Sequence, residues 1–246
     1  MPLTLKSGVW VLGPGGGLTP VAITLAPDSG TPSSIADGAT QDAGMFKGWK
    51  IKDANSGFVS IADDGTTCDV VVNAVSGDSE MTTANIWLTN PRIYLDTPLM
   101  GDFSFSMRFD SDAAMGSALT QLALMVGDGN AVNEAHGVCA RFGRWQTSNG
   151  RNIAYYLVDS GGTSESATDA VAWTTSRELQ IKRVAGTITV SKRVGAGDSW
   201  VAYSTQNLDV AGGHCSVAII FYAATNGEKF RFYLGQVSGY EYTASP

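Results

Sequence analysis

The chain has 246 residues, of which 43% are hydrophobic and 16% are charged, with 29 glycines and 8 prolines. This length suits a single all-β domain with a substantial core, and the glycine and proline content is typical of many short strands joined by turns. The 16 basic and 23 acidic residues give a formal net charge of −7. An acidic surface repels a phosphate backbone, which excludes general nucleic-acid binding, and no run approaches the roughly 18 apolar residues of a membrane span.

The first 43 residues differ in composition from the rest. Short apolar strands are predicted at Val9–Leu12 and Val21–Leu25, on either side of a glycine-rich turn, and residues 26–42 are rich in Pro, Ser, Gly, Thr and Asp. Such a run is typical of a loop or linker. We therefore predict an N-terminal arm and linker at residues 1–43 and a main domain at residues 44–246. The two leading strands either complete the main sheet or dock as an arm on another subunit.

From Met45 onward the pattern is that of β-strands. In Phe103–Phe109 large apolar side chains alternate with two serines and an arginine, the period of two that a half-buried strand requires. Glu178–Val184 and Thr187–Val194 are predicted to pair as a hairpin across a turn that contains glycine. Ser216–Tyr222 does not alternate, which predicts a central strand covered on both faces.

Shorter strand signals occur at near-regular spacing along the remaining chain. They lie at Phe46–Ile51, Gly57–Ile61, Cys68–Ala74, Arg92–Leu95, Leu119–Val126, His136–Phe142, Ile153–Val158, Trp200–Tyr203 and Lys229–Tyr240. Residues 111–118 are predicted to hold one helical turn, and Glu165–Trp173 a surface loop. The pattern predicts an all-β fold, a two-sheet antiparallel jelly-roll β-sandwich with a short N-terminal arm.

The three cysteines, Cys68, Cys139 and Cys215, are odd in number, far apart and set in strand-like apolar segments. This pattern favours buried free thiols over a disulfide framework or a metal site. It is typical of a protein made in a reducing compartment.

Several short motifs follow one another in a characteristic order. Gly-Phe-Val-Ser-Ile at residues 57–61 precedes Gly-Asp-Phe at 101–103, which leads into a core strand. Leu-x-Ile-x-Arg at 179–183 begins a hairpin that ends near Trp200. This order resembles the concanavalin A-like lectin/glucanase superfamily, in its laminin-G-like branch. The resemblance covers roughly residues 45–240 and implies a concanavalin A-like fold. It does not choose among sugar-binding modules, glycosidases, polysaccharide lyases and structural modules of viruses, because a fold does not determine a function.

Retaining glucanases of this superfamily carry an acidic Glu-x-Asp-x-x-Glu cluster on a concave strand. The chemistry needs two carboxyl groups about 5–5.5 Å apart, one as nucleophile and one as acid and base. Leu119–Val126 and Ile153–Val158 contain no acidic residue, and Glu178 has no acidic neighbour two residues away. We therefore expect that the protein is not an enzyme.

An oxygen-rich loop with Asp128, Asn130 and Glu134 is the candidate metal site. Calcium binds several carboxylate, amide and carbonyl oxygens within one loop, and the resemblance to laminin-G-like domains implies calcium in loops of this kind. The alternative, which we favour, is that these are turn residues only. The two histidines, His136 and His214, lack a Cys or His partner at the spacing of a zinc site, so no other cofactor is expected.

The candidate ligand-binding patch consists of Arg141, Arg144, Trp145, Tyr155 and Tyr156. An exposed aromatic ring stacks on the apolar face of a sugar, while polar side chains bond its hydroxyl groups. The alternative for Trp145 is that its ring closes the end of the sandwich, since large aromatic side chains are mostly buried.

Two functions remain. The first is a non-catalytic structural or surface module of a larger assembly, a bacteriophage virion protein of the capsid or tail. Its arm binds other subunits, its sandwich contacts host glycans, and a symmetric homo-oligomer assembles in the host cytoplasm. This hypothesis depends on a start at Met1 without an export signal. The second is a free, extracellular, lectin-like carbohydrate-binding module or glycosidase relative.

Overall fold

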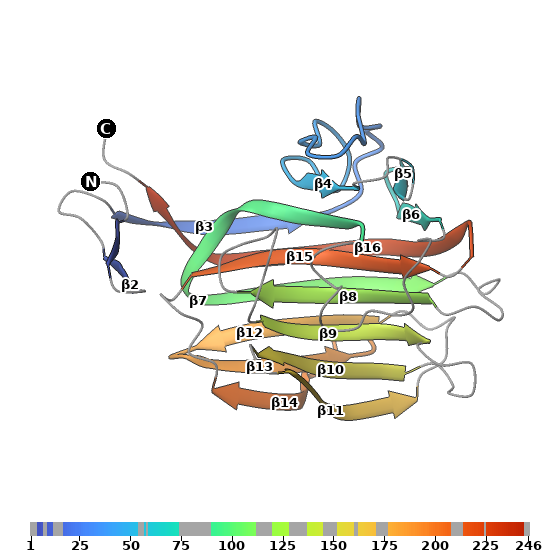
Figure 1. Cartoon of the computed structure of the whole chain (residues 1–246). Coiled ribbons are helices and arrows are strands. Elements are labelled where there is room, and N and C mark those ends of the chain that lie inside the picture. The colour runs from blue at the N-terminus through green and yellow to red at the C-terminus, as the bar shows by residue number, and fades with distance from the viewer. Residues whose placement is uncertain are drawn as a thin grey trace.

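Antiparallel strands make up the regular structure of the described part of this chain (Figure 1). The computed structural model describes residues 4–6, 9–11, 17–53, 57, 59–73, 90–111, 120–127, 137–144, 152–159, 162–170, 177–207, 214–223 and 225–243. Within this part of the chain the strands are β1 (Thr4–Lys6), β2 (Val9–Val11), β3 (Gly17–Leu25), β4 (Lys50–Lys52), β5 (Val59–Asp63), β6 (Cys68–Val72), β7 (Arg92–Ser111), β8 (Thr120–Gly127), β9 (Gly137–Arg144), β10 (Asn152–Asp159), β11 (Gly162–Ala170), β12 (Arg177–Val184), β13 (Thr187–Arg193), β14 (Val201–Asn207), β15 (His214–Ala223) and β16 (Glu228–Thr243).

Two layers of strands share the long strand β7. Residues 92–95 and 99–100 of β7 pair with β15, and residues 92–94 also pair with β4. Residues 103–109 pair with β12, and β16 pairs with residues 104–111 and with Met100. The strand passes from one layer to the other at Gly101, whose φ of +63° favours glycine because a Cβ would crowd the backbone there. The predicted division into Arg92–Leu95 and Phe103–Phe109 is therefore wrong in one respect, since both segments belong to one strand.

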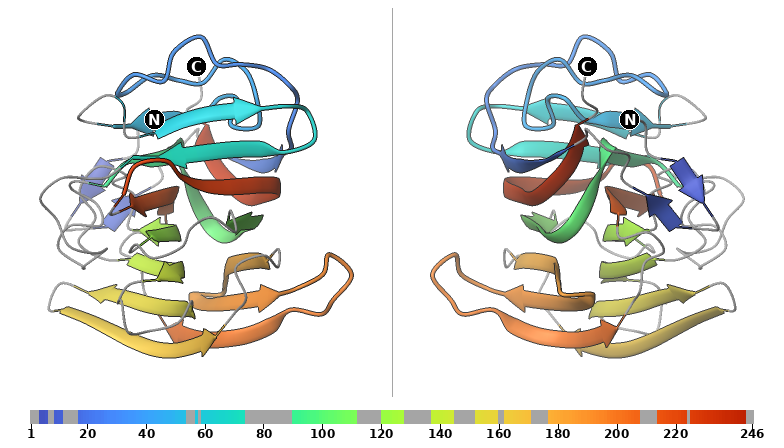
Figure 2. Two further views of the ribbon diagram at one scale, coloured as in Figure 1. Left: turned by 90° about the vertical axis from the view of Figure 1, so that its right-hand side faces the viewer. Right: turned by 90° about the vertical axis from the view of Figure 1, so that its left-hand side faces the viewer.

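One layer runs β4-β7-β15-β8-β9-β10-β11, and the other runs β14-β13-β12-β7-β16. On its free side β16 pairs first with β6, which in turn pairs with β5, and then with β3. In the turned views of Figure 2, the yellow strands β10 and β11 and the orange strands β12 and β13 form opposite sides of the lower part of the molecule. The predicted two-sheet antiparallel β-sandwich is confirmed.

Apolar side chains fill the space between the layers. Phe103, Phe105, Met107 and Phe109 are all buried, as their alternation with polar residues predicts. The ring of Phe221 in β15 meets Phe230 and Phe232 of β16, with ring centroids 5.9 and 6.2 Å apart. Aromatic pairs at such distances add about 0.5–1.5 kcal/mol each to the effect of burial.

Strand β15 is covered on both faces, as its unbroken apolar run predicts. Every residue from Val217 to Ala223 is buried. The predicted β12–β13 hairpin is also confirmed, and its turn residues Ala185 and Gly186 both have positive φ, 48° and 83°. A turn with two such residues matches the right-handed twist of the flanking strands. Cys68 is a buried free thiol, as predicted.

Two local predictions are wrong. Phe46 lies in a turn rather than a strand: Lys47 N donates to Gly44 O at 3.1 Å, and β4 begins only at Lys50. Burial is satisfied without a strand there, because the Phe46 ring packs edge-on against Phe232. The predicted loop at Glu165–Trp173 belongs largely to β11, which pairs with β10. This edge strand is polar, as edge strands often are, and therefore lacks the apolar alternation that marks a strand in a sequence. The predicted helical turn at 111–118 lies outside the described residues apart from Ser111, which ends β7.

The strands of the predicted N-terminal arm differ in what they pair with. Strand β3 pairs with β16 along its full length, from Gly17 opposite Thr243 to Leu25 opposite Gly235 (Figure 1). It therefore completes the main sheet within the same chain. Strands β1 and β2 form a two-stranded sheet of their own. The domain boundary near residue 43 stays a prediction.

Candidate functional site

A row of small polar side chains crosses the outer face of the second layer. Cross-strand pairing places Ser238 of β16 opposite Ser104 of β7, and Ser104 opposite Lys182 of β12. Their strand neighbours Val237, Phe105 and Ile181 are buried in the core, so these three side chains point outward. Thr189 of β13 extends this row, which we call the polar row, at one end, and the small apolar residue Ala22 of β3 lies at the other end.

A second row of polar residues lies directly beside the first. It consists of Thr24, Gln236, Ser106, Gln180 and Ser191. Gln180 Nε2 donates a hydrogen bond to Ser104 Oγ at 3.1 Å, which connects the two rows. Thr24 and Gln236 are exposed and Gln180 is half-buried, whereas Ser106 and Ser191 are buried beneath the outer face.

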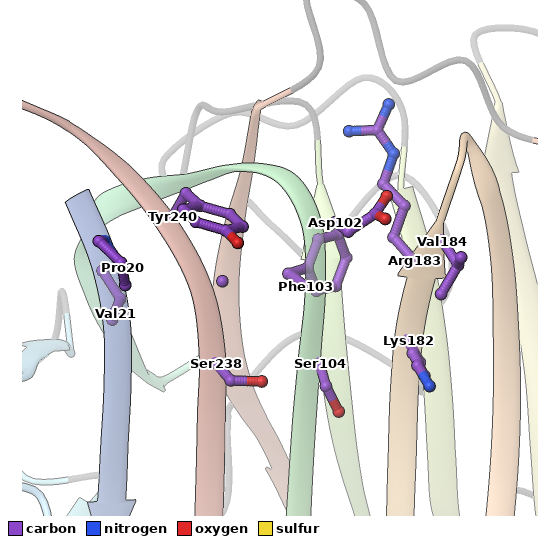
Figure 3. Close-up of a pocket in the computed structure, with 11 residues that line it drawn as sticks. Pro20, Val21, Asp102, Phe103, Ser104, Lys182, Arg183, Val184, Ser238 and Tyr240 are labelled. Carbon is purple, nitrogen blue, oxygen red and sulfur yellow. The ribbon is translucent and has the colours of Figure 1, made fainter. Parts of the chain in front are cut away.

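An open groove of about 400 Å³ lies over the polar row, and we call it the outer groove (Figure 3). Its lining residues are Pro20, Val21, Asp102, Phe103, Ser104, Lys182, Arg183, Val184, Ser238, Gly239 and Tyr240. Tyr240 stands on one side with 41% of its surface exposed, and Val184 is exposed on the other. Leu18, also exposed, lies two residues from Pro20 on β3. The groove thus combines a polar floor with an apolar, partly aromatic rim.

The corner in β7 positions the tyrosine. Ser238 pairs with Ser104, but Tyr240 pairs with Met100, so two residues along β16 span four along β7. This shift brings the Tyr240 segment beside the bend at Gly101. Gly239 allows the close approach, because a Cβ there would lie 3.0 Å from Phe103 Cβ.

Two charged side chains that line the groove near Gly101 make hydrogen bonds to the backbone. Asp102 Oδ1 accepts the backbone N–H of Ala185 at 2.8 Å, which joins β7 to the β12–β13 turn. Arg183 is buried, and its Nη1 donates to the carbonyl oxygen of Gly101 at 3.3 Å. Lys182 is exposed, and no carboxylate of the described residues forms an ion pair with it. Its ammonium group and the exposed carboxylate of Asp102 are therefore the charges at the surface of the groove.

The predicted ligand-binding patch lies in the other layer. Arg141 and Arg144 are in β9, and Tyr155 and Tyr156 are in β10, two strands that pair side by side. The register puts the Arg141 and Tyr156 positions on one face and the Arg144 and Tyr155 positions on the other. Trp145 lies outside the described residues, as do the side chains of these two strands. The patch therefore stays a prediction.

The predicted metal ligands Asp128, Asn130 and Glu134 lie outside the described residues. Where the structure is described, no cluster of His, Cys, Asp and Glu that could hold a metal ion is found. The carboxylate of Asp63, at the end of β5, accepts the backbone N–H groups of Ser29, Gly65 and Met45 at 3.1, 2.9 and 2.8 Å. The bonds from Ser29 and Met45 hold the 26–49 segment against β5.

Glu178, the acidic residue weighed as a catalytic group, is part of a buried ion pair. Its Oε2 accepts from Arg193 Nε at 2.7 Å, and only 3% of its side chain is exposed. The Arg193 guanidinium lies 4.4 Å from the centre of the Trp200 ring. The ion pair between the buried Glu178 carboxylate and Arg193 therefore links β12 to β13. No helix in the described part of the chain could span a membrane.

Sequence reasoning missed the outer groove. Its signal was the polar half of the alternation in Phe103–Phe109, which put Ser104 and Ser106 on one face. The residues that complete the groove come from three other strands, and their register with β7 is not visible in the sequence.

No family model matches the chain, and no curated protein sequence matches it. Several solved structures do match the fold of this chain. A lectin from Bauhinia forficata in complex with GalNAc has a TM-score of 0.55 at 10% identity, over 93% of this chain and 100% of that one. The Ca²⁺/Man2-bound form of the VIP36 exoplasmic/lumenal domain has a TM-score of 0.53 at 11% identity, over 87% of this chain and 86% of that one.

A GH43 protein from Bacillus licheniformis has a TM-score of 0.56 at 10% identity, over 87% of this chain. The match covers 39% of the GH43 chain. At such identities the likeness shows the fold alone. It is a lectin-like β-sandwich, in agreement with the predicted concanavalin A-like fold.

Proposed function

We propose that this protein is a non-catalytic carbohydrate-binding module whose ligand lies in the outer groove. The observation that carries the proposal is the position of Tyr240. Its ring is 41% exposed at the rim of a groove of about 400 Å³. Two serine hydroxyls and a lysine lie in the floor below (Figure 3).

A sugar ring has an apolar face and a rim of hydroxyl groups, and the groove offers a partner for each. A tyrosine ring supplies flat apolar area with little conformational freedom to lose on binding. Ser104 and Ser238 supply hydroxyl groups that both donate and accept. Support also comes from two proteins with the same fold, which were solved in complex with GalNAc and with Man2.

The absence of catalysis is part of the proposal. Hydrolysis of a glycosidic bond needs two carboxyl groups on either side of the bond. Asp102 is the one carboxylate among the residues that line the outer groove, and one of its oxygens accepts the Ala185 N–H. A reducing-end assay on any glycan that binds is expected to show no release of sugar. Measurable cleavage would overturn this part of the proposal.

The binding test is a glycan array probed with the full chain, followed by titration calorimetry on the glycans retained. We expect Tyr240→Ala to weaken binding at least about tenfold, because the aromatic ring that stacks on the sugar is lost. Tyr240→Phe keeps the ring and is expected to keep most of the affinity. Val201→Ala is the matched control, since Val201 is 56% exposed at the start of β14, away from the groove. If Tyr240→Ala binds like the unaltered protein, the groove is not the site.

The finer predictions, a laminin-G-like relative and a bacteriophage virion component, remain proposals. One observation favours an assembly role: β1 and β2 pair with each other and with no described strand of the sandwich. A separate hairpin is available to a neighbouring subunit. Deletion of residues 1–16 leaves β3 intact and is expected to reduce the oligomeric state seen by light scattering. An unchanged mass would argue against an assembly role for the hairpin.

A further inference from the structure

The outer groove carries a positive charge in an acidic protein. Among its lining residues are the cations Lys182 and Arg183 and the anion Asp102, whereas the whole chain has a formal net charge of −7. Charges on distant surfaces are screened over about 8 Å at physiological salt. The local charge therefore decides what a ligand in the groove meets.

Two of these three charged groups, Arg183 and Asp102, also make hydrogen bonds within the fold. Arg183 is buried and donates to the carbonyl oxygen of Gly101, and Asp102 accepts from the Ala185 N–H. Lys182 is exposed on the outer face, and in the described part of the chain no carboxylate pairs with it. An ammonium group donates to any oxygen, and it attracts an anionic oxygen more strongly than a neutral hydroxyl because the charges are opposite.

The serines beside the lysine add donors. Ser104 lies directly opposite Lys182 in the pairing of β7 with β12, and Ser238 follows on β16. Gln180 Nε2 donates to Ser104 Oγ at 3.1 Å, and this bond leaves the Ser104 hydroxyl its own proton to donate. Residues opposite one another have Cβ atoms about 4.5–5.5 Å apart. An ammonium and an O–H donor at that spacing suit an anionic group, which only accepts.

The lysine and the tyrosine lie too far apart for one sugar ring. Lys182 is on β12 and Tyr240 is on β16, with β7 between them. Two strand spacings amount to about 10 Å. A ligand that contacts both groups therefore contains at least two sugar residues.

We infer that the outer groove selects acidic oligosaccharides, with an anionic group at Lys182 and Ser104 and a neighbouring sugar ring against Tyr240 (Figure 3). This inference rests on the proposed carbohydrate-binding function and adds the class of glycan to it. The anionic group is a carboxylate or a sulfate, since the same donors bind both.

The test uses the full chain and matched pairs of glycans. Polygalacturonate and hyaluronan are compared with their carboxyl-reduced forms, and carrageenan is compared with its desulfated form. We expect at least one acidic glycan to bind about tenfold more tightly than its neutral partner, the effect of one charge-assisted hydrogen bond. Lys182→Gln is expected to remove that preference, so that the acidic glycan and its neutral partner bind this variant with equal affinity. Lys47→Gln makes the same change of charge at an exposed loop position and is the control.

The outcomes separate the inference from the proposed function. The inference is supported if the protein prefers the acidic glycan of a pair and Lys182→Gln loses that preference. The pair that shows this preference then tells whether the anionic group is a carboxylate or a sulfate. Equal binding of acidic and neutral members, or a preference that persists in Lys182→Gln, overturns the inference while carbohydrate binding stands. If no glycan binds, acidic or neutral, both are wrong.

Discussion

Replacement of Gly235 by alanine tests the packing that supports the outer groove. Gly235 lies in β16, between β3 and β7, and faces the core. A Cβ at this position would lie 2.7 Å from Met107 Cε, 2.8 Å from Met107 Sδ and 3.1 Å from Leu25 Cβ. Distances this short force the methionine out of its place, and Leu25 has little room to move because it is buried.

We expect Gly235→Ala to destabilise the protein by about 1–3 kcal/mol, the usual cost of an extra methyl group in a well-packed core. For a chain of this size that lowers the melting temperature by about 2–4 °C for each kcal/mol. Thermal unfolding followed by circular dichroism measures the change. Gly197→Ala is the matched control, because a Cβ there meets nothing within 4 Å, and it is expected to change stability by less than about 0.5 kcal/mol.

A second substitution identifies the atoms responsible. Met107→Leu removes the sulfur and the terminal methyl group that the new Cβ would meet, and alone is expected to cost less than about 1.5 kcal/mol. In the double variant the cost of Gly235→Ala should fall by more than half. If Gly235→Ala melts like the unaltered protein, or if Met107→Leu does not reduce its effect, the packing of β16 against β7 has been described incorrectly.

Three further predictions concern groups outside the groove. Asp63→Ala removes the acceptor of three backbone N–H groups and should cost about 1–3 kcal/mol in urea denaturation, and an unchanged midpoint would contradict its role. Arg193→Ala leaves the Glu178 carboxylate, which is 3% exposed, without its ion pair. Since the arginine itself is 19% exposed, we expect Arg193→Ala to lower the free energy of unfolding by about 3 kcal/mol, the low end for a buried ion pair. The loss should be smaller in the double variant that also carries Glu178→Gln, because no buried carboxylate is then left unpaired. Burial and the hydrogen bond to Asp110 raise the pKa of Tyr233 to about 12. The folded state thus keeps a proton that the unfolded state releases above pH 10, so stability falls between pH 10 and about 12, and Tyr233→Phe should flatten that slope in pH-dependent melts.

Part of the candidate site could be read from the sequence. The alternation in Phe103–Phe109 correctly placed Ser104 and Ser106 on the face away from the core. The same reasoning on Lys229–Tyr240 and Glu178–Val184 gave the strands that carry Tyr240 and Lys182. It did not bring these residues together, because each pattern describes one strand and contains no information on its neighbour's register.

Local signals also misjudged segments where the tertiary environment outweighs composition. Polar β11 looks like a loop because an edge strand needs only hydrogen bonds from β10, not an apolar face. Phe46 looks like a strand residue because it is aromatic, yet it is buried from within a turn. In both places the contacts that decide the structure come from distant residues.

The amino-acid sequence by itself determined that this is an all-β sandwich and which side chains enter its core. That is a local matter, since the geometry of a strand sends successive side chains to opposite faces. Only the tertiary structure decided that β3 closes the sheet on β16, that β7 bends between the layers at Gly101, and that Ser238, Ser104 and Lys182 form one row. These are matters of register between distant segments, which are set when the whole core packs at once.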